Sequence, residues 1–334
     1  FNIYAKHENK PKNLFALKVK MPEMAADSFF TALPGGMFRT FKGIKTSGTL
    51  SYQLTFEIDK DNPDSLVFDS SLKKKNFRIN KFGAENYTII DTSFVFEAMD
   101  GDRLVRRITV GPQNPVFTSL DQISPYLKYA VMTSEDGSFM YHRGFNEDAF
   151  RESIITNYKA KRFLRGGSTI TMQLVKNCFL SRDKTVSRKA EEALIVWLIE
   201  NNGLVSKDRM LEVYLNVIEW GPDVYGVGEA SGFYFGKQPK DLNLPECIYL
   251  ASIIPHPKYF KYSFDSTGTL KPFLAGYFRL VSSKMVGRNW ITPADTAGLQ
   301  PSVKLIGPAK NFVLPIDTFS VPIDSIIKED IEIR

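Results

Sequence analysis

Two acidic residues stand side by side at positions 135 and 136, at the start of the run EDGSFMYHRG over 135–144. The preceding residues have helical spacing, so both carboxylates lie at the negative end of a helix dipole, where stability alone does not favour them. A carboxyl group beside aromatic rings such as Phe139 and Tyr141 can have a raised pKa and serve as a general base. A solvated acidic turn would explain the same residues.

A second run whose residues could take part in chemistry is RGGSTITMQ over 165–173, directly before a predicted helix. Two glycines followed by hydroxyl side chains offer backbone N–H groups and side-chain donors to an anion. A plain helix start capped by Ser168 or Thr169 is the alternative. Spacing excludes the nucleotide-binding P-loop, because no Gly-Lys-Ser or Gly-Lys-Thr follows.

Arg188 and Glu192 are four residues apart and share one face of a predicted helix, which is typical of a salt bridge within a helix. Further cations stand nearby in the sequence at Lys176, Lys184 and Lys189. Such a cluster fits a substrate that carries phosphates. Two carboxylates, Glu135 and Glu192, would satisfy acid–base chemistry on a sugar bond. The cations favour transfer from a sugar pyrophosphate over hydrolysis, which needs no such cluster.

The order EDGSFMYHRG, GGSTITMQLVKN, RKAEE and KDRMLEVYLN resembles the family 51 glycosyltransferases, the peptidoglycan polymerase domains of class A penicillin-binding proteins and monofunctional transglycosylases. The resemblance extends over residues 123–262 and includes the stretch from EWGPDVYGVGEASG to IIPHP. It implies a mostly helical, lysozyme-like fold. It also implies polymerisation of lipid II into glycan strands, with release of undecaprenyl pyrophosphate.

The resemblance assigns roles to individual residues. Glu135 would be the general base on the 4-hydroxyl of the incoming lipid II. Glu192 would assist at the donor pyrophosphate and is the one candidate ligand for a divalent cation, Mg²⁺ or Mn²⁺; no organic cofactor is implied. Substrate contacts are expected from Asp136, Phe139, His142, Ser168, Thr169, Gln173, Lys176, Lys184, Arg188 and Lys189.

Some features of the motifs qualify this assignment. Met172 stands where the family usually has glutamine, and Lys184 stands where many members have arginine, so one forked phosphate contact becomes a point charge. Tyr214 and its neighbours Glu212 and Asn216 in the fourth motif fit a structural helix better than direct chemistry. His142 fits an ordered internal group better than a metal ligand, because His7 and His256 are not at ligand spacing.

The resemblance also predicts where the protein acts and what it meets. The mixture of basic and aromatic residues over 145–164 matches the family's mobile jaw, which touches the bilayer. We therefore expect a membrane surface, lipid II, the growing glycan and cell-wall synthesis proteins as partners, at the extracytoplasmic face of the cytoplasmic membrane. The chain opens at Phe1, and the expected anchor would lie in a segment missing from it. The net charge of +6, from 43 basic and 37 acidic residues, is spread along the chain and gives no reason to expect nucleic acid.

The elements around these motifs predict an α+β protein. Apolar and polar residues alternate over 15–21 and 50–58, with further strand-like runs over 87–96 and 104–110 and a short helix over 22–33. Residues 1–115 are therefore predicted to form an antiparallel β-rich region, similar to repeats of AsmA-like envelope proteins. Residues 116–334 are predicted as the glycosyltransferase domain with a C-terminal extension.

Within the second region, helices are predicted over 125–134, 185–202 and 244–254, and a further one begins at the cap Ser206. Ser124 is the expected cap of the first helix, with proline at its first position. In the second helix, Ala190, Ala193, Leu194, Trp197 and Leu198 are expected to face inward.

Two other functions compete with the transferase. A glycan-cleaving hydrolase on the related lysozyme fold would need no cation cluster and no GGSTIT loop. A weakened scaffold, with lipid or partner binding in the β-rich region, would not need both glutamates and the cations. Cys178 and Cys247 supply neither a disulfide framework nor a metal cluster.

Overall fold

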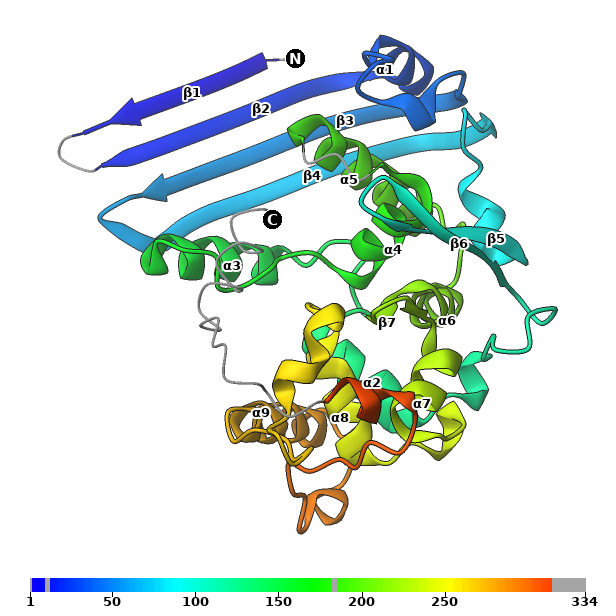
Figure 1. Ribbon diagram of the computed structural model, residues 1–334. Helices are drawn as coiled ribbons and strands as arrows, with labels where there is room; N and C mark the ends of the chain where they lie inside the picture. Colours follow the sequence, from blue (N-terminus) through cyan, green and yellow to red (C-terminus); the bar gives the residue numbers. More distant parts are fainter. Residues whose placement is uncertain (1, 10–12, 182–184, 314–334) are drawn as a thin grey trace.

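The computed structural model describes residues 2–9, 13–181 and 185–313 and has an α+β fold, as expected. Figure 1 shows a long antiparallel sheet at one end of the molecule and most of the helices at the other. The sheet has the order β1-β2-β3-β4 and consists of Asn2–Glu8, Leu14–Ala25, Lys45–Asp59 and Asn62–Lys81. A separate hairpin follows, formed by β5 (Phe94–Asp100) and β6 (Arg103–Val110).

The structure both confirms and corrects the predicted β-rich region. The alternating runs over 15–21 and 50–58 lie in β2 and β3. Strands β1 and β4 were not predicted, and β4 is hard to recognise because its centre reads SSLKKK. The predicted strand over 87–96 is wrong in its first half. A 3-10 helix spans Tyr87–Asp91, because the Asn86 side chain accepts a hydrogen bond from the Thr88 backbone and starts a turn there.

Helix α1 spans Ala26–Ala32, shorter than the helix predicted over 22–33. Residues 22–25 continue β2, past a break in the pairing register between Met21 and Met24. Pro22 lacks a backbone N–H, and such an irregular point in a strand tolerates it. The sheet therefore extends four residues further toward α1 than the sequence pattern indicates.

The helices that follow include those predicted near residues 125, 170, 185, 206 and 244, whereas the helices over 147–160, 227–235 and 274–287 were not predicted. They are α2 (Pro125–Glu135), α3 (Glu147–Ala160), α4 (Ile170–Phe179), α5 (Val186–Asn201), α6 (Lys207–Val217), α7 (Val227–Phe235), α8 (Leu244–Ile253) and α9 (Leu274–Gly287). The predicted cap Ser206 accepts from the Arg209 backbone N–H, and Gly203 after α5 has φ 60°. Ser124 precedes α2, but its hydroxyl donates to the Leu242 carbonyl oxygen, so it ties α2 to the chain before α8 and does not cap the helix.

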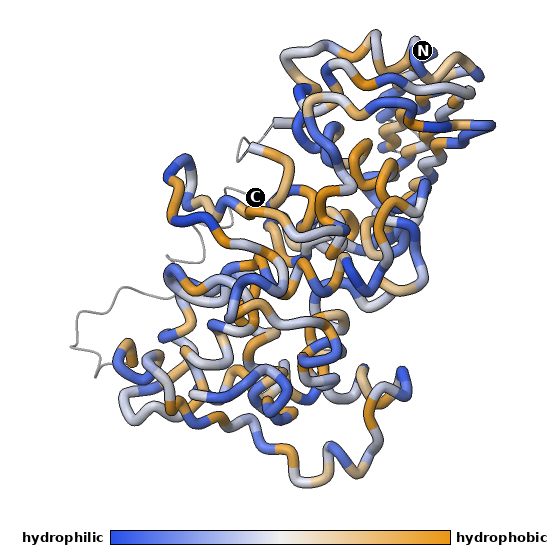
Figure 2. Tube along the Cα trace, turned by 90° about the vertical axis from the view of Figure 1, so that its right-hand side faces the viewer, coloured by the Kyte–Doolittle hydropathy of each residue, from blue (hydrophilic) through white to orange (hydrophobic). Residues whose placement is uncertain are grey.

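The interior continues from the sheet into the helices. The Trp197 indole N–H donates to the Leu72 carbonyl oxygen of β4 at 3.2 Å, and the Trp197 ring contacts Phe77 at a centroid distance of 5.4 Å. Figure 2 shows apolar segments running through the middle of the molecule, where helices meet the sheet. Ala190 is exposed, contrary to the prediction, because the first turns of α5 reach beyond this interior. Residues before and after position 115 belong to one described hydrophobic core. A boundary between two domains at residue 115 therefore stays a prediction.

None of the helices in the described residues has both the length and the apolar character that are needed to cross a membrane.

Candidate active site

Glu135 is the last residue of α2, and its carboxylate is held by a side chain from α4. Gln173 donates from Nε2 to Glu135 Oε2 at 2.8 Å. The other end of the same amide, Oε1, accepts from the Tyr214 hydroxyl of α6 at 3.0 Å. Glu135 is half-buried, whereas Tyr214 is fully buried. Three helices thus fix the orientation of one partly accessible carboxylate.

The neighbouring carboxylate, Asp136, connects parts of the chain around the site. It is buried, and both of its oxygens lie 2.9 Å from His142 Nε2. One of them also accepts from the backbone N–H of Ile170, the first residue of α4, at 3.1 Å. His142 Nδ1 accepts from the Gly144 backbone, so Nε2 carries the proton that is donated to Asp136. Asp136 and His142 therefore join the end of α2 to the start of α4, and their predicted contact with substrate stays a prediction.

The loop before α4 is hydrogen-bonded to the end of the first motif. Thr169 is the N-cap of α4, and its hydroxyl donates to the Gly144 carbonyl oxygen at 2.7 Å. Gly144 has φ 92°, and a Cβ there would lie 2.4 Å from the Val196 side chain, so only glycine fits. Met172 is buried, which shows that the position where the family usually has glutamine faces the interior here.

Phe139 lies in the core, with 1% of its side chain exposed. The Lys207 ammonium lies over its ring, 4.4 Å from the centroid, and is paired with Glu200 at 2.6 Å. Glu200 also accepts from the Thr171 hydroxyl. Phe139 thus anchors the first motif beneath the site, and a direct contact with substrate stays a prediction.

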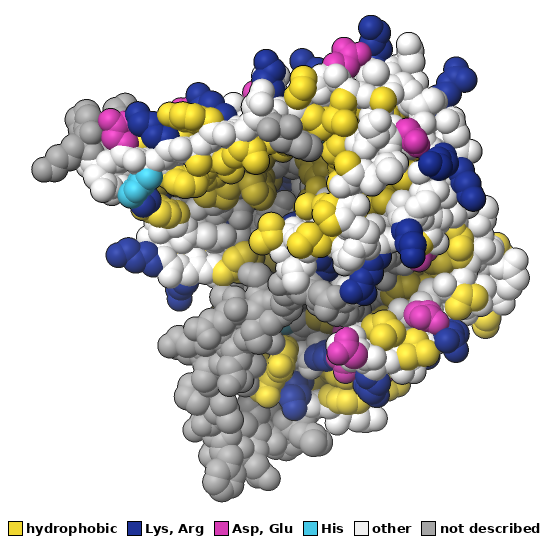
Figure 3. Space-filling model, turned by 90° about the horizontal axis from the view of Figure 1, so that it is seen from above, with side chains coloured by type: hydrophobic (Ala, Val, Ile, Leu, Met, Phe, Trp, Pro, Cys, Tyr) yellow, Lys and Arg dark blue, Asp and Glu magenta, His cyan; other side chains and the backbone are white. Residues whose placement is uncertain are grey.

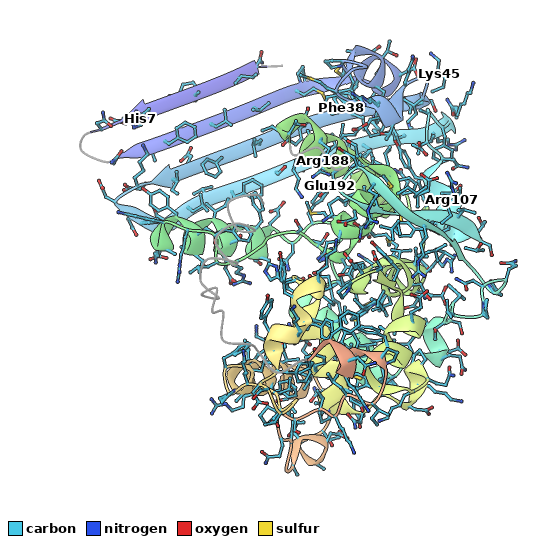
Figure 4. All side chains as sticks on the ribbon, in the orientation of Figure 1. His7, Phe38, Lys45, Arg107, Arg188 and Glu192 are labelled. Carbon is cyan, nitrogen blue, oxygen red and sulfur yellow. The ribbon has the colours of Figure 1, made fainter. Side chains whose placement is uncertain are left out.

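The third motif forms an ion cluster at the start of α5. Glu192 is buried and receives Arg188 Nη1 at 3.0 Å and Lys189 Nζ at 2.5 Å. Figure 4 shows Arg188 and Glu192 together on α5, in front of the sheet. Lys189 also donates to the Ser168 hydroxyl at 3.3 Å, which links this cluster to the glycine-rich loop. Two cations on one carboxylate leave an excess of positive charge beside that loop.

Lys176 and Lys184 are the remaining cations predicted from the sequence. Lys176 is half-buried in the last turn of α4, on the helix that carries Gln173. Lys184 lies outside the described residues. Glu191, next to Glu192, is buried and accepts from both the backbone N–H and the hydroxyl of Thr40, so it fixes α5 to the β-rich region.

The fourth motif is mainly structural, in agreement with the sequence interpretation. Glu212 accepts from the Leu120 backbone at 2.8 Å, and Asn216 exchanges two hydrogen bonds with the backbone of Thr118. Tyr214 is the exception because of its bond to Gln173. Burial raises the pKa of Tyr214, and the nearby carboxylates of Glu135 and Asp136 raise it further, so its hydroxyl remains a donor.

Two residues of the surroundings were missed from the sequence, and both come from the region of α9. The Tyr277 hydroxyl lies 2.5 Å from the Ser134 hydroxyl, one residue before Glu135. Burial and the charge of Glu135 raise the pKa of Tyr277, while the Ser134 hydrogen bond lowers it. The Arg288 guanidinium occupies the space where a Cβ at Gly137 would lie, at 2.2 Å from Nη2. No motif spacing could reveal them, because they lie about 140 residues away from the first motif.

The described residues fit poorly to a metal site built by the protein alone. Both oxygens of Glu192, the candidate ligand, are bound by cationic side chains. Across the described ranges, no group of three histidine, cysteine or acidic side chains is arranged to hold an ion. We therefore assign no chemical step to a metal.

Comparison with known proteins adds to this geometry. Residues 101–272 match the family described as transglycosylase. The chain is 40% identical over 165 residues to a biosynthetic peptidoglycan transglycosylase of Paraburkholderia xenovorans, a match that covers 49% of this chain and 66% of the relative. It is 40% identical over 183 residues to a protein with the same name in Nitrosomonas eutropha, which covers 53% of this chain and 74% of the relative. The chain thus spans about two thirds of the length of these curated relatives.

Proposed function

The chain belongs to the transglycosylase family, and on that premise we propose that it is a peptidoglycan glycosyltransferase that polymerises lipid II and releases undecaprenyl pyrophosphate. Family membership confirms the resemblance found in the motifs. Two features of the site support the proposed reaction: a partly accessible carboxylate fixed by two layers of hydrogen bonds, and a cation cluster beside a glycine-rich loop.

Glu135 acts as the general base. The 4-hydroxyl oxygen of the acceptor lipid II attacks the anomeric carbon of the donor chain, and its proton passes to the Glu135 carboxylate. The bond between that carbon and the pyrophosphate oxygen breaks, and its electron pair leaves with the phosphate. Gln173 contributes by holding Oε2 of Glu135, so that the carboxylate is oriented before the substrate arrives.

Arg188 and Lys189 stabilise the negative charge that grows on the departing pyrophosphate. Cations fixed in advance stabilise such charge better than mobile ones, because they need no reorganisation during the reaction. Glu192 provides this fixation by pairing with both residues from a buried position. Ser168, bound to Lys189, places the hydroxyl and backbone of the glycine-rich loop next to the same charge. Lys176 and Lys184 complete the cluster in this proposal, and a divalent cation at the pyrophosphate stays a proposal from the resemblance alone.

The site of action follows from the substrate. Peptidoglycan polymerisation takes place outside the cytoplasm, and lipid II is held in the outer leaflet of the cytoplasmic membrane. We place α3 and the following loop against that surface, because Tyr158 and Leu164 are exposed there among basic residues. Anchoring by a further segment and contacts with cell-wall synthesis proteins belong to the same proposal.

The test is incubation with labelled lipid II, followed by sizing of the glycan. The proposal expects lengthened strands from the parent protein and none from Glu135→Gln. Glu97→Gln is the matched control, because it is the same acidic-to-amide change at an exposed position of β5, where Glu97 pairs with Arg107. Shortened strands from preformed glycan would instead establish the hydrolase alternative.

A further inference from the structure

The four-stranded sheet has two chemically different faces. Because side chains alternate along a strand, the pairing register brings Leu17 of β2 beside Phe56 of β3, and Phe56 beside Phe68 of β4. Val19 and Leu54 form the next such pair. Together with Phe15, these residues make one continuous surface, which we call the apolar sheet face. The opposite face carries residues such as Lys18, Thr55 and Asp69 in the intervening positions.

The apolar sheet face is not covered by the described core. Its six residues belong neither to the hydrophobic core cluster nor to the partly buried residues packed against it, whereas Met21 and Leu50 further along the same strands are fully buried. Phe15 has 36% of its side chain exposed, and the other five are half-buried. Figure 3 shows hydrophobic side chains gathered around a hollow at the upper left of the view.

This face is continuous with the cation cluster. The Phe68 ring lies 4.7 Å from the ring of Phe150 on α3, measured between centroids. Phe150 in turn borders the glycine-rich loop, since a Cβ at Gly167 would lie 3.2 Å from its ring. The next residue, Ser168, accepts the hydrogen bond from Lys189. These contacts connect the cation cluster at Lys189 to the apolar sheet face at Phe68.

We propose that the apolar sheet face binds the polyisoprenoid chain of the lipid-linked substrate while the cation cluster binds its pyrophosphate. This inference rests on the proposed function and deepens it. A molecule with an anionic head and a long hydrocarbon tail matches both ends of the path at once, which neither a partner strand nor a second copy of the sheet would do. A strand advances about 3.3 Å per residue, so the four steps from Phe15 to Val19 provide roughly 13 Å of apolar surface along β2. The sheet precedes the family match over 101–272, so this binding surface is not a part of the matched segment.

The test uses the double variant Leu17→Gln/Phe56→Gln, which makes the centre of the face polar, and the matched control Lys18→Gln/Thr55→Gln, which alters the paired positions on the opposite face. The measured quantity is the ratio of kcat/KM for lipid II with its full undecaprenyl chain to kcat/KM for an analogue with a short, water-soluble chain. We expect the double variant to lower this ratio roughly tenfold, because two side chains lose their apolar contact with the tail. The control should keep the parent ratio. A double variant with the parent ratio would overturn the proposal.

A second measurement does not depend on turnover. Binding of undecaprenyl phosphate in detergent should weaken in the double variant by a similar factor and remain unchanged in the control. Phe15→Gln, at an exposed position, tests the same face if the double variant does not fold, and it should weaken binding in the same direction. Equal affinity for all variants would refute the apolar sheet face as the binding surface. Absence of polymerisation by the parent protein would refute the proposed function, while this binding measurement would still decide the inference.

Discussion

Gln173 binds the Glu135 carboxylate through one end of its amide and is itself bound by Tyr214 at the other end. Its Nε2 donates to Glu135 over 2.8 Å, while its Oε1 accepts from Tyr214 over 3.0 Å. A flipped amide would place Oε1 against the Glu135 carboxylate, so the bond to Glu135 would be lost, because both groups are acceptors. The orientation of the proposed general base is therefore linked to α6 through Gln173.

Glu135→Gln should abolish polymerisation and leave the fold intact. Loss of a general base costs about 10² to 10⁴ in rate. The side chain is half-buried and isosteric with glutamine, so the melting temperature should stay close to that of the parent. The measurement is the initial rate with labelled lipid II, with Glu97→Gln as control. More than a tenth of the parent rate would remove Glu135 from this role.

Tyr214→Phe should lower kcat by roughly an order of magnitude with little change in KM, because it frees Gln173 to rotate away from Glu135. Loss of one neutral hydrogen bond should reduce the free energy of unfolding by only about 1 kcal/mol. Gln173→Leu removes the donor itself, so kcat should fall at least as far, because the Glu135 carboxylate loses the bond that orients it. A change in stability with unchanged kcat in both variants would reduce the two residues to structural roles.

Arg188→Ala and Lys176→Ala should each lose at least about tenfold in rate if both stabilise the departing pyrophosphate. Arg188→Lys keeps the charge but loses the forked geometry, so an intermediate loss is expected. If Arg188 serves only as the partner of Glu192, the lysine variant should be nearly silent in rate and in melting temperature. Initial rates across lipid II concentrations, together with thermal melts, separate these cases. Parent-like rates for both alanine variants would contradict the leaving-group role.

Lys184→Arg should hold or improve the rate, because arginine restores a forked phosphate contact at a position where the sequence departs from its family. Lys184 lies outside the described residues, so this expectation comes from the motif alone. Lys240→Arg, on the short helix over Pro239–Asp241, is a suitable control for the same chemical change elsewhere. A clear loss of rate in Lys184→Arg would show that this position does not bind the pyrophosphate.

Leu164→Ser should weaken binding to anionic vesicles with little effect on the melting temperature, because its side chain is 53% exposed in the loop after α3. Phe150→Ser is a less clean test of the same surface, since the Phe150 ring contacts Phe68 of the sheet. Leu104→Ser, at an exposed position of β6, is the matched control. Vesicle sedimentation gives the answer, and unchanged binding by Leu164→Ser would move the membrane contact to another surface.

Features that depend on neighbours along the chain could be predicted from the sequence. The spacing of four residues places Arg188 and Glu192 on one face of α5, and the structure joins them at 3.0 Å. The cap Ser206 and the left-handed Gly203 follow from the preferences of single residues. The order of the motifs indicated the family and the two glutamates for the same reason, because each motif is a short, continuous segment.

Contacts between groups far apart in the sequence depend on how the helices and strands pack. Gln173 and Glu135 are 38 residues apart, and Tyr214 is 41 residues from Gln173, so their bonds depend on how α2, α4 and α6 pack. Likewise, β4 could not be recognised, because its polar centre SSLKKK hides the alternation and its partner β3 supplies the register. Asp136 and Glu192 look like equally available carboxylates in the sequence. Packing buries both and gives each a fixed partner, because a buried charge is tolerated only where other groups compensate it.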